Sequence, residues 1–232
     1  MSGSSKYYLL LFCLILYSCS RYKALDQLEK EVFLHFPFQE YGQNRGLSDT
    51  LIFYKPTVLK EKLEQVETYQ TQLSTINPTK NWAPEKQVLL EELRTYLQML
   101  ESDLLNYQTD PSHYNLGGIL AQNLSNPILD KNQKSQWCLQ TLHQSSMYYR
   151  TAQLCLAEPD PDRLQLAIEK QLFTIKFMEN NLRDSIQQWM LPEDQTKAFT
   201  KGLYIANLAC KDYIAFCNSL LFEKREAGLF SK

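Results

Sequence analysis

Apolar residues recur at spacings of three, four and seven along most of this chain, and those spacings place them on one face of an α-helix. One such stripe carries Leu89, Leu93, Leu97, Leu100 and Leu104. We find no long stretch in which polar and apolar residues alternate, which is the pattern of a half-buried strand. The sequence therefore predicts an all-α protein.

The pattern divides into seven helices, and prolines mark several of the divisions. The residue before a proline avoids the helical region, so Asn77-Pro78 and Asn126-Pro127 end helices, whereas Pro84 and Pro111 stand in first turns. Short connections favour antiparallel neighbours in a helical bundle or array. The expected helices run over about 21–36, 56–76, 84–104, 111–125, 130–157, 162–190 and 193–225.

Two helices carry more detailed expectations. Gly117 and Gly118 lie inside the fourth helix, where each costs about 1 kcal/mol relative to Ala, so they mark a close helix crossing or a break. The sixth helix is expected to bury one apolar stripe, made of Leu164, Ile168, Leu172, Ile175, Leu182, Ile186 and Trp189.

The N-terminus has the layout of a signal peptide. Lys6 precedes an uncharged run from Tyr7 to Tyr17, which is about half of the roughly 20 residues that a membrane-spanning helix needs. The run ends in Leu16-Tyr17-Ser18-Cys19, which resembles the lipobox of bacterial lipoproteins. We expect residues 1–18 to be removed and Cys19 to be lipidated. An ordinary secretory signal with an incidental cysteine is the alternative.

Lipidation fixes where the protein works and how its chain divides. Acyl chains on Cys19 gain about 0.8 kcal/mol per buried CH₂, which predicts stable attachment to a membrane. Ser20-Arg21 follows without an acidic cluster, so we favour the periplasmic leaflet of the outer membrane in a bacterial envelope. Residues 19–50 are the lipidated N-terminus, first helix and loop, and residues 51–232 complete one helical domain with 21–50.

Charge and cysteine content narrow the function. The chain has 24 Lys and Arg against 26 Asp and Glu, a net charge of −2, which gives no electrostatic case for binding nucleic acid. Four cysteines remain beyond the lipobox: Cys138, Cys155, Cys210 and Cys217. Cys210 and Cys217 are about 10 Å apart along a helix, beyond the reach of a disulfide, and are expected to pack as small apolar residues. Whether Cys138 and Cys155 bond stays open.

Candidate chemical groups are sparse. The chain has no phosphate-loop, hydrolase-elbow, dinucleotide or H-E-x-x-H motif, so we predict no catalytic, cofactor-binding or metal-binding residue. The histidines His35, His113 and His143 are scattered, and we interpret the last two as structural. The carboxylates of Glu91, Glu92, Glu101 and Asp103 are interpreted as a solvated helix face. The aromatic residues Tyr148, Tyr149, Phe173, Phe177 and Trp189 are interpreted as core, with a ligand groove as the alternative.

Helical landmarks over most of the mature chain resemble the bacterial domain-of-unknown-function 885 family, which includes many lipoproteins. The resemblance implies the N-terminal helical half of a peptidase-like protein whose other half binds zinc through H-E-x-x-H. The matching stretches are Phe36-Pro37, Gly42, Leu47–Asp49, Leu89–Leu105, Asp110–Tyr114, Tyr149–Leu154, Pro159, Ala167-Ile168, Ala206–Leu221 and Gly228–Phe230.

The sequence departs from that family because it ends about where the zinc-binding half is expected to begin. No position here corresponds to the family's metal ligands or general base. Our leading hypothesis is therefore a non-catalytic, membrane-anchored helical domain that binds or scaffolds a partner. One alternative is half of a split peptidase completed by a downstream polypeptide, and another is a ligand-binding helical lipoprotein.

Overall fold

The computed structural model describes residues 23–37, 51, 54–76 and 83–230, with side chains described as far as Glu226. Throughout these residues the regular secondary structure is helical, so the all-α prediction is confirmed. Leaving aside one short 3₁₀ element, the described residues form seven continuous helical stretches, the expected number. The predicted signal peptide, Cys19 and the expected loop containing Gly42 lie outside the described residues.

The chain forms two compact units, each made from two separate segments. The first unit combines Met1–Gly42 with Lys62–Ser102, and the second combines Gln43–Glu61 with Asp103–Lys232. Two long helices, α3 (Pro56–Ser74) and α4 (Pro84–Thr109), therefore each contribute residues to both units. The expected single domain over 21–232 stays a prediction.

The first unit packs three helical stretches through the apolar stripes that the sequence predicts. The helix over residues 23–35 buries Leu25, Leu28 and Val32. Polar contacts fix how the stretches meet: the Tyr96 hydroxyl donates to the Phe36 carbonyl at 2.8 Å, and Lys86 pairs with Asp26. The further buried apolar residues of this unit are Phe36, Val66, Tyr69, Leu73, Ile76, Leu90, Leu93, Tyr96, Leu97 and Leu100.

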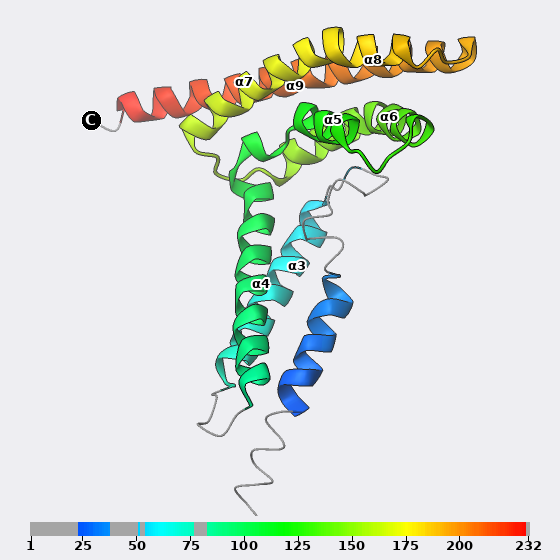
Figure 1. The fold of residues 1–232 in the computed structure, drawn as a ribbon. Coiled ribbons are helices and arrows are strands. Elements are labelled where there is room, and N and C mark those ends of the chain that lie inside the picture. Colours follow the sequence, from blue (N-terminus) through cyan, green and yellow to red (C-terminus); the bar gives the residue numbers. More distant parts are fainter. Residues whose placement is uncertain (1–22, 38–50, 52–53, 77–82, 231–232) are drawn as a thin grey trace, which may run out of the picture. The chain divides into compact units, whose positions relative to one another are not determined.

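The second unit is built around α9 (Glu193–Phe230), which packs along both α6 (Lys131–Cys155) and α7 (Pro161–Phe177). Figure 1 shows α7 and α9 as neighbouring long helices in yellow and orange to red. The shorter α5 (Leu116–Ser125) packs against α6 and α7. A π-helical turn, η3 (Met178–Leu182), and α8 (Arg183–Gln188) continue α7 towards the turn before α9.

The predicted fourth helix is two elements, which corrects the continuous helix expected over 111–125. Asp110 caps a short 3₁₀ helix, η2 (Pro111–His113), by accepting from the Ser112 backbone amide at 2.8 Å. The chain leaves the helical region at Tyr114, and Asn115 then caps α5 by accepting from Gly118. The break occurs because the fully buried Tyr114 donates its hydroxyl to the Tyr107 carbonyl at 2.8 Å.

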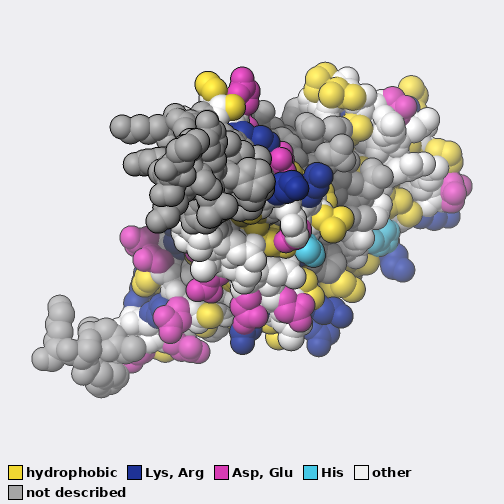
Figure 2. Space-filling view, turned by 90° about the horizontal axis from the view of Figure 1, so that it is seen from below, with side chains coloured by type: hydrophobic (Ala, Val, Ile, Leu, Met, Phe, Trp, Pro, Cys, Tyr) yellow, Lys and Arg dark blue, Asp and Glu magenta, His cyan; other side chains and the backbone are white. Residues whose placement is uncertain are grey.

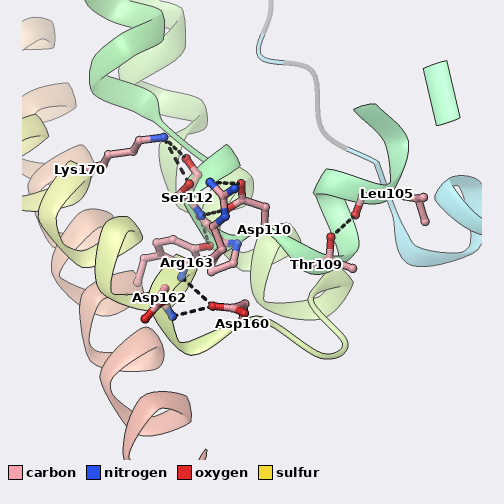
Figure 3. Close-up of polar contacts among 10 residues, drawn as sticks. Leu105, Thr109, Asp110, Ser112, Asp160, Asp162, Arg163 and Lys170 are labelled. Atoms are coloured by element: carbon pink, nitrogen blue, oxygen red, sulfur yellow. Dashed lines mark hydrogen bonds and ion pairs between the residues drawn. The ribbon is translucent and has the colours of Figure 1, made fainter. Parts of the chain in front are cut away.

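Polar contacts hold the start of α7 against η2, as Figure 3 shows. The Asp160 carboxylate accepts from the backbone amides of Asp162 and Arg163 at 2.7 and 3.4 Å, which caps α7. The Arg163 guanidinium lies 3.6 Å from the Asp110 carboxylate, and Lys170 donates to the Ser112 carbonyl at 3.0 Å. These pairs are explained by helix capping and element packing, so we assign them a structural role.

Gly117 marks a close crossing of α5 and α7, one of the two explanations expected for the Gly-Gly pair. A Cβ added at Gly117 would lie 2.4 Å from Thr174 Oγ1 and 3.0 Å from Thr174 Cα. The Gly117 amide also donates to Thr174 Oγ1 at 3.2 Å. A side chain at this position would therefore separate the two helices and break their hydrogen bond.

The buried face of the sixth predicted helix differs from the expected apolar stripe. Leu172 is 50% exposed, while Ile175 and Trp189 are only half-buried, so the expectation for Leu172 is wrong. The polar residues Gln171 and Thr174 are fully buried in its place. Their side chains form hydrogen bonds with partners on other elements, which offsets the cost of burying polar groups. Such partners cannot be recognised from the spacing of apolar residues.

Gln171 joins two other elements through one side chain. Its Nε2 donates to the Tyr114 carbonyl at 2.7 Å, and its Oε1 accepts from the Tyr149 hydroxyl. Tyr213 of α9 stacks on Tyr149, with 4.7 Å between ring centroids, and donates its hydroxyl to the Pro111 carbonyl at 2.9 Å. The interior of the second unit is therefore a polar and aromatic network as well as an apolar core.

Candidate ligand groove

The π-helical turn Met178–Leu182 interrupts the helix that the sequence predicts as continuous over 162–190. Five residues of π-helix leave the backbone wider than an α-helix, and such turns are frequent at functional sites. Met178 and Leu182 are both buried in the second unit. The π-helical turn thus keeps two side chains in the core while it changes the spacing of the side chains between them.

A groove of about 410 Å³ lies between this turn, α8 and α9. Met178, Ile186, Phe199 and Leu203 supply most of its apolar lining, and the first three are buried. Tyr204, also in the lining, is 66% exposed. The volume lies within the range of about 300–1,000 Å³ that is usual for small-molecule sites.

The turn between α8 and α9 supports the apolar wall of the groove. The Trp189 ring packs on Phe199, with 5.9 Å between centroids. Met190 then adopts φ 48°, the left-handed conformation in which helices commonly end. The chain thereby reverses and carries Phe199 and Leu203 of α9 beside Met178 and Ile186.

Charged and polar side chains also line the groove. Asn207 donates from Nδ2 to Glu179 Oε1 at 3.2 Å, which joins the π-turn to α9. The Thr200 hydroxyl donates to the Thr196 carbonyl at 3.0 Å, so it is already bonded within its own helix. The guanidinium of Arg183, at the start of α8, has no hydrogen-bond or ion-pair partner among the described residues.

Both signs of charge occur on one face of the molecule. On the face drawn in Figure 2, Lys and Arg side chains are interspersed with Asp and Glu side chains. This distribution agrees with a net charge of −2 and offers no extended basic surface on the described part of that face.

The histidines singled out from the sequence lie at separate places. His113 is half-buried, 4.5 Å from the Tyr107 ring between centroids, and His143 is exposed on α6. His35 Nδ1 lies 2.6 Å from the Tyr69 hydroxyl in the first unit. In the part of the chain that the structure describes, no group of three or more His, Cys, Asp or Glu residues is placed to hold a metal ion.

The carboxylates on α4 lie mostly at the surface. Glu91 and Glu92 are exposed, and Glu91 pairs with Arg94 one turn later at 2.6 Å. Glu101 is half-buried and accepts from Gln70 Nε2 at 2.8 Å. Asp103 is also half-buried, so the interpretation as a solvated face fits Glu91 and Glu92 better than Glu101 and Asp103.

The aromatic residues considered for a groove do not form the one observed. Tyr148 and Tyr149 are buried as expected of core, but Phe173 is 65% exposed, so the core interpretation is wrong for that residue. Phe177 and Trp189 are half-buried. The aromatic residues that line the groove are Phe199 and Tyr204. The spacing of apolar residues places both on α9 but does not indicate that they line a groove.

The four described cysteines are free thiols and buried. Burial raises the pKa of the Cys138, Cys210 and Cys217 thiols to about 12, and it raises the pKa of Cys155 as well. The Cys210 thiol also contacts the Tyr149 hydroxyl at 3.7 Å. The thiols are thus protonated core groups at neutral pH, as expected for Cys210 and Cys217.

No family model matches the chain, and no curated protein does. Its fold is similar to that of a solved structure described as "a putative lipoprotein of unknown function from Shewanella oneidensis". The TM-score is 0.67 at 16% identity, and the match covers 90% of this chain but 39% of the other. The chain therefore spans less than half the length of that protein, and the likeness shows a shared helical fold.

None of the described helices contains an apolar stretch of the length that a membrane-spanning helix requires.

Proposed function

We propose that this protein is a lipoprotein of the bacterial envelope, held on the membrane through Cys19, whose helical domain binds a ligand without catalysing a reaction. The lipobox-like Leu16–Cys19 supports the anchor. The similar fold of a protein described as a lipoprotein agrees with it. The binding role rests on one observation, the apolar groove beside the π-helical turn.

The groove supports binding better than catalysis because of the groups that line it. Its lining combines an apolar floor with one guanidinium, one carboxylate and neutral amide and hydroxyl groups. A hydrolytic site needs an activated nucleophile or a metal-bound water, and this lining has no Ser–His or Cys–His pair. The arrangement is that of a site which selects a molecule by shape and charge.

A second candidate is the helical part of a longer, peptidase-like protein such as those of the domain-of-unknown-function 885 family. The similar solved structure is longer than this chain, and α9 carries an exposed apolar stripe. Tyr204, Leu208 and Phe222 of that stripe are 66, 42 and 65% exposed, and with the exposed Ala215 they are spaced by four, seven and seven residues. By helix geometry they lie opposite the buried Ala206, Cys210 and Cys217, where a partner polypeptide would contact them.

The intact mass of the native polypeptide, extracted from host membranes in detergent, distinguishes the two candidates. A mass equal to residues 19–232 plus lipid supports the anchored binding domain. The mass of a polypeptide hundreds of residues longer contradicts the proposal that the helical domain is a separate protein, and it favours the peptidase-like candidate.

Cys19→Ala tests the anchor itself. The thiol is the group that receives the lipid, so the variant is expected to accumulate as an unprocessed precursor without acyl chains. Metabolic labelling with radioactive palmitate and electrophoretic mobility measure both effects. Cys13→Ala, within the same apolar run, is the matched control and should be processed normally. Normal maturation of Cys19→Ala would overturn the lipoprotein proposal.

A further inference from the structure

The lining of the groove is specific enough to indicate a class of ligand. We propose that it binds a single-chain amphiphile with one anionic head, such as a fatty acid or an alkyl phosphate. This inference rests on the binding function proposed above. It assigns the apolar floor to the alkyl chain and Arg183 to the head.

The floor suits a flexible alkyl chain. Met178, Ile186, Phe199 and Leu203 present apolar surface to the groove, and burying methylene groups there removes them from water. Methionine adapts its shape to the molecule it contacts because its side chain is unbranched and polarizable. The volume of about 410 Å³ accommodates a small molecule.

Arg183 supplies the complementary charge for an anionic head. A guanidinium presents a planar set of donors that matches the oxygens of a carboxylate or phosphate. The described residues offer Arg183 no such partner, although it lines the groove. Glu179, the other charged residue of the lining, already accepts a hydrogen bond from Asn207, so the unmatched group is the cation.

The two charges make opposite predictions for an anion. Arg183→Gln removes the attraction and should weaken binding about fivefold, the effect of one charge-assisted hydrogen bond in an exposed position. Glu179→Gln removes a nearby negative charge but retains an oxygen that accepts from Asn207, so binding should tighten or stay unchanged. A zwitterionic ligand would lose affinity in both variants.

The experiment uses the full lipidated chain in phospholipid nanodiscs and a photoreactive diazirine derivative of octanoate. After irradiation, peptide mass spectrometry locates the label, and protein-free nanodiscs correct for partition into the membrane. Label is expected within residues 178–187 and 196–207, which contain the groove lining. Octanoate and octyl phosphate should compete, whereas octanol should not, and the better competitor identifies the head group.

Matched variants separate the groove from general effects. Arg150→Gln removes an exposed arginine of α6 outside the groove lining and should leave labelling unchanged. Thr200→Trp fills the groove and should abolish the label. Thr95→Trp is its control, because Thr95 is an exposed α4 threonine with the same hydrogen bond to its own helix, and it should leave the label unchanged. Circular dichroism confirms folding of each variant.

Three outcomes overturn the ligand assignment. Label distributed over the whole chain contradicts a site, competition by octanol as strong as by octanoate contradicts an anionic head, and unchanged labelling in Arg183→Gln contradicts the assigned cation. None of these changes the mass of the acylated Cys19 polypeptide. The ligand assignment and the lipoprotein proposal can therefore fail separately.

Discussion

Gly117→Ala is expected to destabilise the second unit by about 2–4 kcal/mol. The new methyl group would lie 2.4 Å from Thr174 Oγ1 and 3.0 Å from the backbone Cα of Thr174, well inside normal contact. Overpacking of this kind costs about 1–3 kcal/mol, and the buried hydrogen bond between the Gly117 amide and Thr174 would weaken as the helices separate. The gain in helix propensity, about 1 kcal/mol, offsets only part of this loss.

Gly118→Ala is the matched control for this prediction. Gly118 is exposed, and a Cβ there would meet only the Asn115 side chain, 2.5 Å from Nδ2. Asn115 can rotate away at the expense of its capping bond, and the lost cap roughly cancels the gained helix propensity. Urea unfolding should place Gly118→Ala within about 1 kcal/mol of the wild type. Equal stability of the two variants would contradict a tight crossing at Gly117.

The sequence predicts the fold class because apolar periodicity records which face of each helix is buried. The helical spacing also places Phe199, Leu203, Ala206, Cys210, Tyr213, Cys217 and Leu221 on one face of α9, and all of them are buried except Leu203, which is half-buried. The ends of the helices follow from local chemistry at prolines and capping residues such as Asp110. Both kinds of signal depend on residues a few positions apart in the chain, so they can be recognised in a single sequence without knowledge of the tertiary structure.

The buried polar residues of α7 and the groove could not be predicted because their causes are not local. Gln171 is buried through bonds to Tyr149 and Tyr114, which are 22 and 57 residues away along the chain, and apolar periodicity gives such a residue no weight. The π-helical turn inserts its change of spacing within a stretch that otherwise has helical periodicity. Arg183 and Phe199 meet at one groove only because the chain reverses between α8 and α9.

Raising the pH above 9 is expected to destabilise the second unit, with a loss of about 4 kcal/mol of folding stability by pH 10. Burial raises the pKa of the Cys138, Cys210 and Cys217 thiols from 9.0 to about 12. In the unfolded chain these thiols ionise near 9, so stability is fully present below pH 9 and falls as the unfolded state releases protons. Each group contributes about 1.4 kcal/mol per pH unit in that window.

Buried tyrosines add to the loss at higher pH. Burial raises the pKa values of Tyr114, Tyr149 and Tyr213 well above 10. Above pH 10 these hydroxyls therefore lose their protons in the unfolded chain but not in the folded one, which lowers the stability further. A domain with a typical stability of about 5–15 kcal/mol should therefore be unfolded near pH 11. Near-ultraviolet circular dichroism of the reduced protein, measured in urea between pH 7.5 and 10.5, follows the decline.

The slope of stability with pH assigns this effect to particular thiols. Cys217→Ala removes one buried group, so it should reduce the slope between pH 9 and 10.5 by about 1.4 kcal/mol per pH unit, whatever the variant costs at pH 7.5. Ser146→Ala is the control, since it changes an exposed residue of α6 that does not titrate in this range, and it should leave the slope unchanged. A slope unaffected by Cys217→Ala would mean that this thiol ionises equally in the folded and unfolded states, which would contradict its complete burial in the second unit.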